Sequence, residues 1–369
     1  MLVLVLVLVL AGFCVGELAA DEVTPGRAKA SPAAAMMLAV VVVMATVRTR
    51  AWPRSLAAIF ERAPEVLSFM GPRIGDVVHP FRWETSEPPM KLARQTARYC
   101  APMSEERHDN VRVQRHGEIA EVVLDRPEAM NALDTATLRA LDVIFTNLAG
   151  DSSVLVVVLT SAGERAFCAG ADLKERAAMT DAEIMAQRPV FRSAFGALLD
   201  LPQPAIAAVH GYALGGGCEL ALSCDVIVAD GTAVFGLPET SVGLVPGCGG
   251  TQLAARRIGP GRAAELIFTG RRIDAPLADA IGLVDLLFMV GNARDHALEL
   301  AGKVAANSPV AVRAAKRALR NGAGLGLPAA LEVEDAAWRT AAGSADRREG
   351  VAAFAEKRQP AWPSVTPDG

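Results

Sequence analysis

A run of six consecutive aliphatic residues at positions 154–159 constrains the fold of this chain more than any other feature. The run is mostly β-branched and has no alternating polar positions, which predicts a strand buried on both faces. Residues 205–209 and 226–228 form two further runs of this kind, and each is followed by a loop or by the start of a helix. Strands that alternate with helices in this way predict an α/β fold.

The remaining periodicity between residues 104 and 369 is equally regular. Residues 111–114 and 119–124 read as two strands around a turn at His116 and Gly117. Residues 135–148 carry apolar side chains at helical spacing after Asp134, a plausible N-cap. After about residue 250 we expect helices nearly throughout, at residues 250–258, 260–268, 276–281, 292–306, 309–320, 328–342 and 344–357.

Residues 1–103 differ in character from the rest of the chain. Their two apolar runs, 1–10 and 33–47, are shorter than the roughly 20 residues that a membrane-spanning helix needs. Three interpretations are open: a membrane-inserting leader, a targeting segment, or upstream sequence preceding a natural start at Met103. We expect this N-terminal extension to be poorly ordered. We expect no stable membrane insertion of residues 104–369.

Charge and cysteine usage narrow the class of protein. A net charge of −4 gives no basic field for nucleic acid, so we expect no nucleic-acid partner. The six cysteines form no C-x-x-C pair and the five histidines show no metal-ligand spacing. We therefore expect no metal site, a reducing compartment and a cytoplasmic location, with targeting by the apolar runs left open. We expect Cys168 and Cys218 to be small buried packing residues rather than nucleophiles.

Three short segments contain the candidate chemistry, at residues 166–173, 214–220 and 235–239. Gly170 allows backbone angles that turn the N–H of Ala171 into a cavity. Gly216 opens a helix, where free N–H groups and the helix dipole stabilise negative charge. Glu219 lies one turn into this otherwise apolar helix, and Glu239 follows a Gly-Leu-Pro stretch.

Two carboxylates beside two backbone donors form a set suited to acid–base chemistry next to a polarised carbonyl. Buried carboxylates are costly unless they are used or paired. The structural alternatives are glycines that serve only tight packing, a helix-terminal Glu219 and a surface Glu239. The chemical interpretation requires that the three segments share one pocket.

The same segments carry a family resemblance. They read Ala-Phe-Cys-Ala-Gly-Ala-Asp-Leu-Lys-Glu at residues 166–175, Ile-Ala-Ala-Val-His-Gly-Tyr-Ala-Leu-Gly-Gly-Gly-Cys-Glu-Leu-Ala at 206–221, and Phe-Gly-Leu-Pro-Glu-Thr-Ser-Val-Gly-Leu-Val-Pro-Gly-Cys-Gly-Gly-Thr-Gln at 235–252. In this order and spacing they resemble the enoyl-CoA hydratase/isomerase (crotonase) superfamily. The resemblance extends from about residue 110 to 363 and includes the tail at 346–358.

The resemblance implies a spiral of ββα turns at residues 104–300 and a helical oligomerisation region at 301–369, assembled as a trimer or a dimer of trimers. It implies an acyl-CoA thioester substrate and no separate cofactor, since coenzyme A is part of the substrate. The thioester oxygen would bind the N–H groups of Ala171 and Gly216, with Glu219 and Glu239 as the catalytic pair. The implied contacts of substrate and coenzyme A are Arg165, Ala169, Gly170, Asp172, Leu173, Lys174 and Lys357.

Both glutamates are present, which favours an enoyl-CoA hydratase that adds water to give 3-hydroxyacyl-CoA. The alternatives on the same fold are an enoyl-CoA isomerase and a methylglutaconyl-CoA hydratase. Residues 171–179 are similar to the methylglutaconyl-CoA hydratase branch of the family. An alternative of another class is an RNA-binding relative. The corresponding helix at 135–148 holds Arg139 as its only cation, which disfavours RNA binding. The two intact glutamates also argue against an inactive scaffold.

Overall fold

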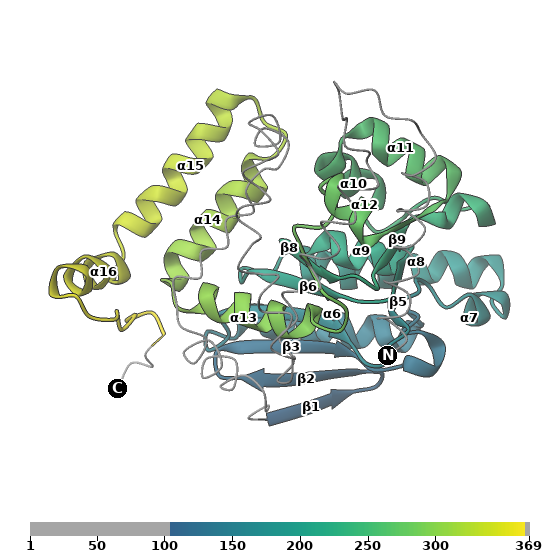
Figure 1. Ribbon diagram of the computed structural model, residues 1–369, viewed down its shortest axis with the longest axis horizontal. Coiled ribbons are helices and arrows are strands. Elements are labelled where there is room, and N and C mark those ends of the chain that lie inside the picture. Colours follow the sequence, from purple (N-terminus) through teal and green to yellow (C-terminus); the bar gives the residue numbers. More distant parts are fainter. Residues whose placement is uncertain (1–103, 366–369) are drawn as a thin grey trace, which may run out of the picture. The chain divides into compact units, whose positions relative to one another are not determined.

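The computed structural model describes residues 104–365, and these residues form two β-sheets and a set of helices (Figure 1). The expectations for residues 1–103 lie outside the described residues. Within residues 104–365, no helix is long and apolar enough to cross a membrane.

The larger sheet has seven strands in the order β1-β2-β3-β4-β6-β8-β11. The first three strands pair antiparallel, and every later neighbour pairs parallel. Hydrogen bonding in register along β3, β4, β6 and β8 confirms the expected buried strands. Their bounds are β1 Ser104–His108, β2 Val111–His116, β3 Ile119–Leu124, β4 Val156–Ser161, β6 Ala205–Val209, β8 Val226–Asp230 and β11 Leu286–Phe288.

A second sheet of four short strands has the order β10-β9-β7-β5. Strands β5, β7 and β9 each follow a strand of the larger sheet along the chain, and helices or a helical turn come next. This repetition of strand, short strand and helix is the ββα pattern that we expected. The bounds are β5 Ala166–Cys168, β7 Tyr212–Leu214, β9 Val234–Gly236 and β10 Arg272–Asp274.

Helices cover both faces of the larger sheet and continue beyond it at the C-terminal end (Figure 1). One apolar cluster packs the sheet against α6, α8 and α9, and a second packs its other face against α13. Their bounds are α6 Thr135–Gly150, α7 Leu173–Ala177, α8 Asp181–Leu199, α9 Gly216–Ser223, α10 Gly250–Ile258, α11 Pro260–Thr269, α12 Ala275–Ala280, α13 Ala293–Ala305, α14 Pro309–Gly322, α15 Leu327–Ala342 and α16 Ala345–Glu356; 3-10 turns span Pro127–Ala129 (η2) and Pro238–Val242 (η3).

The expected elements agree with these bounds to within a few residues, and Asp134 does cap α6. The seven helices expected after residue 250 are all present, and two strands of three residues, β10 and β11, lie among them and were not expected. The strand β1 was also missed, because its residues are all polar and it pairs only at the sheet edge. Three-residue strands are too short to show an alternating pattern.

Candidate active site

The three glycine-rich and glutamate-bearing segments meet at one place in the fold. A Cβ atom placed on Gly216 would lie 3.8 Å from the backbone nitrogen of Ala171. A Cβ atom placed on Gly215 would lie 3.2 Å from Oε1 of Glu239. The three segments therefore lie next to one another, which the chemical interpretation of the sequence requires.

The backbone around Ala171 is fixed by a parallel bridge to Leu133. The N–H of Leu133 donates to the carbonyl of Gly170 at 2.8 Å, and the N–H of Asp172 donates to the carbonyl of Leu133 at 3.0 Å. Because these bonds involve the residues on either side of Ala171, its own N–H points away from Leu133. Gly170 adopts φ +98°, and a side chain there would meet the carbonyl oxygen of Leu214 at 2.8 Å.

Gly216 supplies the second backbone donor at the start of α9. The N–H of a residue in the first helical turn has no acceptor within the helix, and the helix dipole makes it a good site for negative charge. Gly215 before it has φ +52°, a left-handed conformation that favours glycine. The N–H groups of Ala171 and Gly216 can therefore serve one oxygen between them.

Glu219 is buried in the first turn of α9, with 2% of its surface exposed. Its Oε1 accepts hydrogen bonds from the backbone N–H of Cys248 at 2.6 Å and of Gly250 at 2.8 Å. Burial raises the pKa of Glu219, while these two N–H donors and Arg188 act in the opposite direction. The two donors also fix the orientation of the carboxylate.

Glu239 lies in the first turn of η3 and is the more strongly perturbed of the two carboxyl groups. Burial, with a further contribution from the charge of Glu219, raises its pKa to about 7. Its Oε2 is buried and has no hydrogen-bond partner among the described residues. One carboxyl group held by donors and one that keeps its proton near neutral pH make an acid–base pair.

The cysteines of the site are packing residues. Cys168 and Cys218 are buried, as expected from the sequence. Burial raises the pKa of Cys168 to about 12 and also raises that of Cys218. A thiol with such a pKa is not a nucleophile at neutral pH.

The residues expected around coenzyme A are spread over several elements. Ala169 and Gly170 lie in the backbone segment that leads to Ala171, and Leu173 and Lys174 are exposed at the start of α7. Arg165 is exposed directly before β5. Lys357 is the C-cap residue that follows α16, and α16 and α7 lie on opposite sides of the view in Figure 1. Within one chain the structure thus does not bring Lys357 to Lys174, and its contact with substrate stays a prediction.

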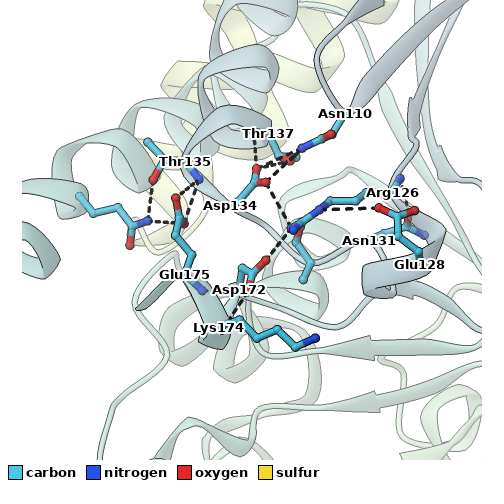
Figure 2. Close-up of polar contacts among 12 residues, drawn as sticks. Asn110, Arg126, Glu128, Asn131, Asp134, Thr135, Thr137, Asp172, Lys174 and Glu175 are labelled. Carbon is cyan, nitrogen blue, oxygen red and sulfur yellow. Dashed lines mark hydrogen bonds and ion pairs between the residues drawn. The ribbon is translucent and has the colours of Figure 1, made fainter. Parts of the chain in front are cut away.

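Asp172 differs in character from the other expected contacts, because its side chain is buried. Its carboxylate caps α7 and pairs with Arg126 (Figure 2). The roles of Arg126 and of the Cys248 and Gly250 donors were missed at the sequence level. The Gly-Cys-Gly-Gly stretch at residues 247–250 was a usable signal, since a glycine turn before a helix exposes N–H groups.

Comparisons with known proteins agree with this architecture. A sequence model described as "Enoyl-CoA hydratase/isomerase" matches residues 114–365. The chain is 41% identical to the short-chain-enoyl-CoA hydratase of Clostridium acetobutylicum, covering 68% of this chain and 96% of that protein. It is 42% identical to the 2,3-dehydroadipyl-CoA hydratase of Escherichia coli, covering 67% and 96%.

The fold also matches solved structures. The crystal structure of an enoyl-CoA hydratase from Bacillus anthracis superimposes with a TM-score of 0.68 at 43% identity, covering 69% of this chain and all of that one. The family match extends over more than half of the chain and includes all three site segments. The chain therefore belongs to the enoyl-CoA hydratase/isomerase family.

Proposed function

We propose that this protein is an enoyl-CoA hydratase, which adds water syn across the 2,3-double bond of a 2-enoyl-CoA thioester to give 3-hydroxyacyl-CoA. The observation that supports this most is the pair Glu219 and Glu239 beside two free backbone donors. An isomerase needs only one group to move a proton between two carbons of the substrate. Hydration needs one group to activate water and another to supply a proton.

The thioester oxygen binds the N–H groups of Ala171 and Gly216. Negative charge grows on this oxygen as hydroxide attacks the β-carbon and the α-carbon gains enolate character. Preorganised donors stabilise that charge more than they stabilise the neutral thioester, which lowers the barrier. Loss of one such donor typically costs about 3–4 kcal/mol of transition-state stabilisation.

The two glutamates divide the proton transfers. Glu219, whose Oε1 is held by two N–H donors, accepts a proton from water while the oxygen of water bonds to the β-carbon. Glu239, whose pKa is about 7, gives its proton to the α-carbon. One proton is taken and one is given, so the substrate gains H and OH. Exchange with solvent then returns the proton to Glu239 and removes it from Glu219.

Coenzyme A extends from the site past the start of α7 in this proposal. Lys174 and Arg165 carry exposed positive charge near residues 169–171, the oxyanion segment, whose backbone leads to the N–H of Ala171, and they would meet the phosphates of coenzyme A. Lys357 would contribute only from another copy of the chain. The names of the relatives extend the candidate acyl groups from short chains to one that ends in a carboxylate.

Assembly of several copies, as a trimer or a dimer of trimers, is part of the proposal. Ala337 is the only buried residue of α15, although this helix has 16 residues and is rich in apolar side chains. Six of the large apolar side chains with at least half of their surface exposed lie on the last three helices. They are Leu319, Leu327, Leu331, Trp338, Val351 and Phe354. Such a surface is typical of an interface with a further copy.

Steady-state rates on a panel of substrates test the proposal. The panel contains crotonyl-CoA, longer 2-enoyl-CoAs, 2,3-dehydroadipyl-CoA, 3-methylglutaconyl-CoA and a 3-enoyl-CoA. Hydration removes the absorbance of the conjugated thioester, and isomerisation of the 3-enoyl-CoA creates it. We expect hydration to be faster than isomerisation by at least about tenfold. Isomerisation without hydration of any member would refute the proposal.

A further inference from the structure

The guanidinium group of Arg126 lies between two carboxylates that flank the oxyanion segment (Figure 2). Its Nη1 is 2.6 Å from Oδ2 of Asp172 and 3.2 Å from Oδ2 of Asp134. Asp172 directly follows Ala171, and Asp134 directly follows Leu133, the residue bridged to Ala171. A single cation therefore links both strands of the bridge that orients the N–H of Ala171.

Both carboxylates are also helix caps that use Oδ1, so Arg126 pairs with Oδ2 of each, and Oδ2 of Asp134 also accepts from the Asn110 amide at 3.1 Å. Oδ1 of Asp172 accepts from the N–H groups of Lys174 and Glu175 at the start of α7, at 2.9 and 3.1 Å. Oδ1 of Asp134 accepts from the N–H of Thr137 at the start of α6, at 2.8 Å. Arg126 thus joins the first turns of α6 and α7, and the farther of the two cap residues, Asp172, lies 46 residues from Arg126 in the sequence.

The loop between Arg126 and Leu133 contains two residues with unfavourable backbone dihedral angles. Met130 and Asn131 both have φ +53°, a left-handed conformation that costs a side-chain-bearing residue about 1–2 kcal/mol. The Asn131 amide holds the loop by donating to the carbonyls of Ala162 and Ala166 at 2.9 and 2.8 Å. The N–H of Arg126 donates to Oδ1 of Asn131 at 2.9 Å. The loop therefore depends on Arg126 through its backbone as well as its side chain.

The charge of Arg126 also matters to the reaction. Burial raises the pKa of Asp172, but the hydrogen bond and charge of Arg126, together with the backbone N–H groups of Glu175 and Lys174, outweigh it, and the pKa lies below its usual value. Without the guanidinium, two carboxylates would stand near the oxygen on which enolate charge develops. Like charges repel more strongly in a partly buried site than in water. Because the thioester is neutral and the enolate is not, the penalty would fall on the transition state.

We propose that Arg126, through its ion pairs with Asp134 and Asp172, is a positioning residue that aims the N–H of Ala171 at the thioester oxygen. The inference deepens the proposed hydratase function and rests on it for the identity of that oxygen. Arg126 acts through the backbone of Ala171 and does not touch substrate. Its loss should therefore reduce stabilisation of the enolate and leave binding of coenzyme A itself unchanged.

The test compares Arg126→Met with Arg115→Met as a matched control. Arg115 also forms an ion pair, with Asp151 at 2.7 Å, and its side chain is 23% exposed against 24% for Arg126. Arg115 lies in β2, away from the site segments. We expect Arg126→Met to lower kcat on crotonyl-CoA by about tenfold to a hundredfold, the cost of a misplaced reacting group, with KM nearly constant. Arg115→Met should keep kcat.

A second readout follows the enolate directly. Acetoacetyl-CoA is a β-ketoacyl thioester whose enolate absorbs in the near ultraviolet, so its bound enolate fraction can be titrated against pH. Arg126→Met should raise the apparent pKa of the bound ligand by about one unit, a tenfold loss of enolate stabilisation. The affinity for free coenzyme A, measured by calorimetry, should not change. This titration reports on the donors even if no enoyl-CoA is hydrated, so failure of the two proposals is distinguishable.

Two results would overturn the inference. An enolate titration of Arg126→Met that matches Arg115→Met would reduce Arg126 to an ordinary ion pair. Weaker binding of free coenzyme A with an unchanged kcat would show that Arg126 contacts the cofactor portion of the substrate. If Arg126→Met does not fold, Arg126→Gln decides instead, since glutamine can still donate hydrogen bonds but carries no positive charge. An enolate titration of Arg126→Gln identical to the unsubstituted protein would then refute the proposal.

Discussion

Replacing Glu239 by glutamine tests the raised pKa on which its role as proton donor depends. Burial, together with the charge of Glu219, places that pKa at about 7. The protonated fraction is then about a half at pH 7, about a tenth at pH 8 and about a hundredth at pH 9. A rate that requires protonated Glu239 should therefore fall about tenfold for each pH unit above pH 8.

The same shift predicts how stability depends on pH. The folded protein holds the Glu239 proton up to about pH 7, whereas the unfolded chain releases it near pH 4.3, an approximate reference value for glutamate. Between these values the folded state binds more protons, so the stability contribution is complete below the lower pKa and declines as pH rises to the upper one. Glu239→Gln removes this decline.

Rates from pH 6 to 10 and thermal melts from pH 4.5 to 8 check both consequences. Glu239→Gln should lower kcat about a hundredfold to ten-thousandfold at pH 7, the usual scale of acid–base catalysis. Its melting temperature should depend less on pH than that of the unsubstituted protein, whereas Glu334→Gln, an exposed control on α15, should change neither property. If the alkaline fall in rate persists at the same pH in Glu239→Gln, another group titrates and the reasoning is wrong.

Three further substitutions have definite outcomes. Gly250→Ala would place a Cβ 3.0 Å from Oε1 of Glu219, so kcat should fall at least about tenfold. The control Gly261→Ala in α11 adds a Cβ that meets nothing within 4 Å and should leave kcat unchanged. Gly216→Val should reduce turnover by orders of magnitude and weaken acetoacetyl-CoA binding in calorimetry, with only a modest change in melting temperature; unchanged binding would make Gly216 a packing residue. Glu121→Gln should destabilise the fold by about 1–3 kcal/mol in denaturant unfolding, because it removes the buried charge to which His116 and Arg294 are hydrogen-bonded. Burial raises the pKa of Glu121, but the hydrogen bonds and charges of His116 and Arg294 outweigh burial and leave that pKa below its usual value. In the unsubstituted protein this stability is therefore present above about pH 4.3 and is lost as pH falls through the folded pKa.

The periodicity of the chain was enough to predict the α/β class, the central strands and the C-terminal helices. Burial on both faces leaves a continuous aliphatic run such as residues 154–159, and a helix leaves apolar residues at a spacing of 3.6. Glu219 and Glu239 could be selected because each is a carboxylate in an apolar or glycine-rich context. These are local properties, and each can be read within about ten residues.

The second sheet and the support of the site were decided only by the tertiary structure. Strands of three residues are stabilised by pairing with strands some 20 to 45 residues away, which leaves too little local pattern to recognise. The N–H donors of Glu219 lie 29 and 31 residues further along the chain. Arg126 reaches a carboxylate 46 residues away.

The need for glycine at position 217 is of the same kind. A Cβ there would lie 2.0 Å from the carbonyl oxygen of Cys168, a backbone contact between α9 and β5 that the sequence around Gly217 does not record. The pKa of Glu239 likewise depends on burial by distant segments and on a second carboxylate 20 positions earlier in the chain. Local sequence determines which residues are available for chemistry. The path of the chain in space determines their hydrogen bonds and their protonation, because both depend on atoms that other segments bring within a few ångströms.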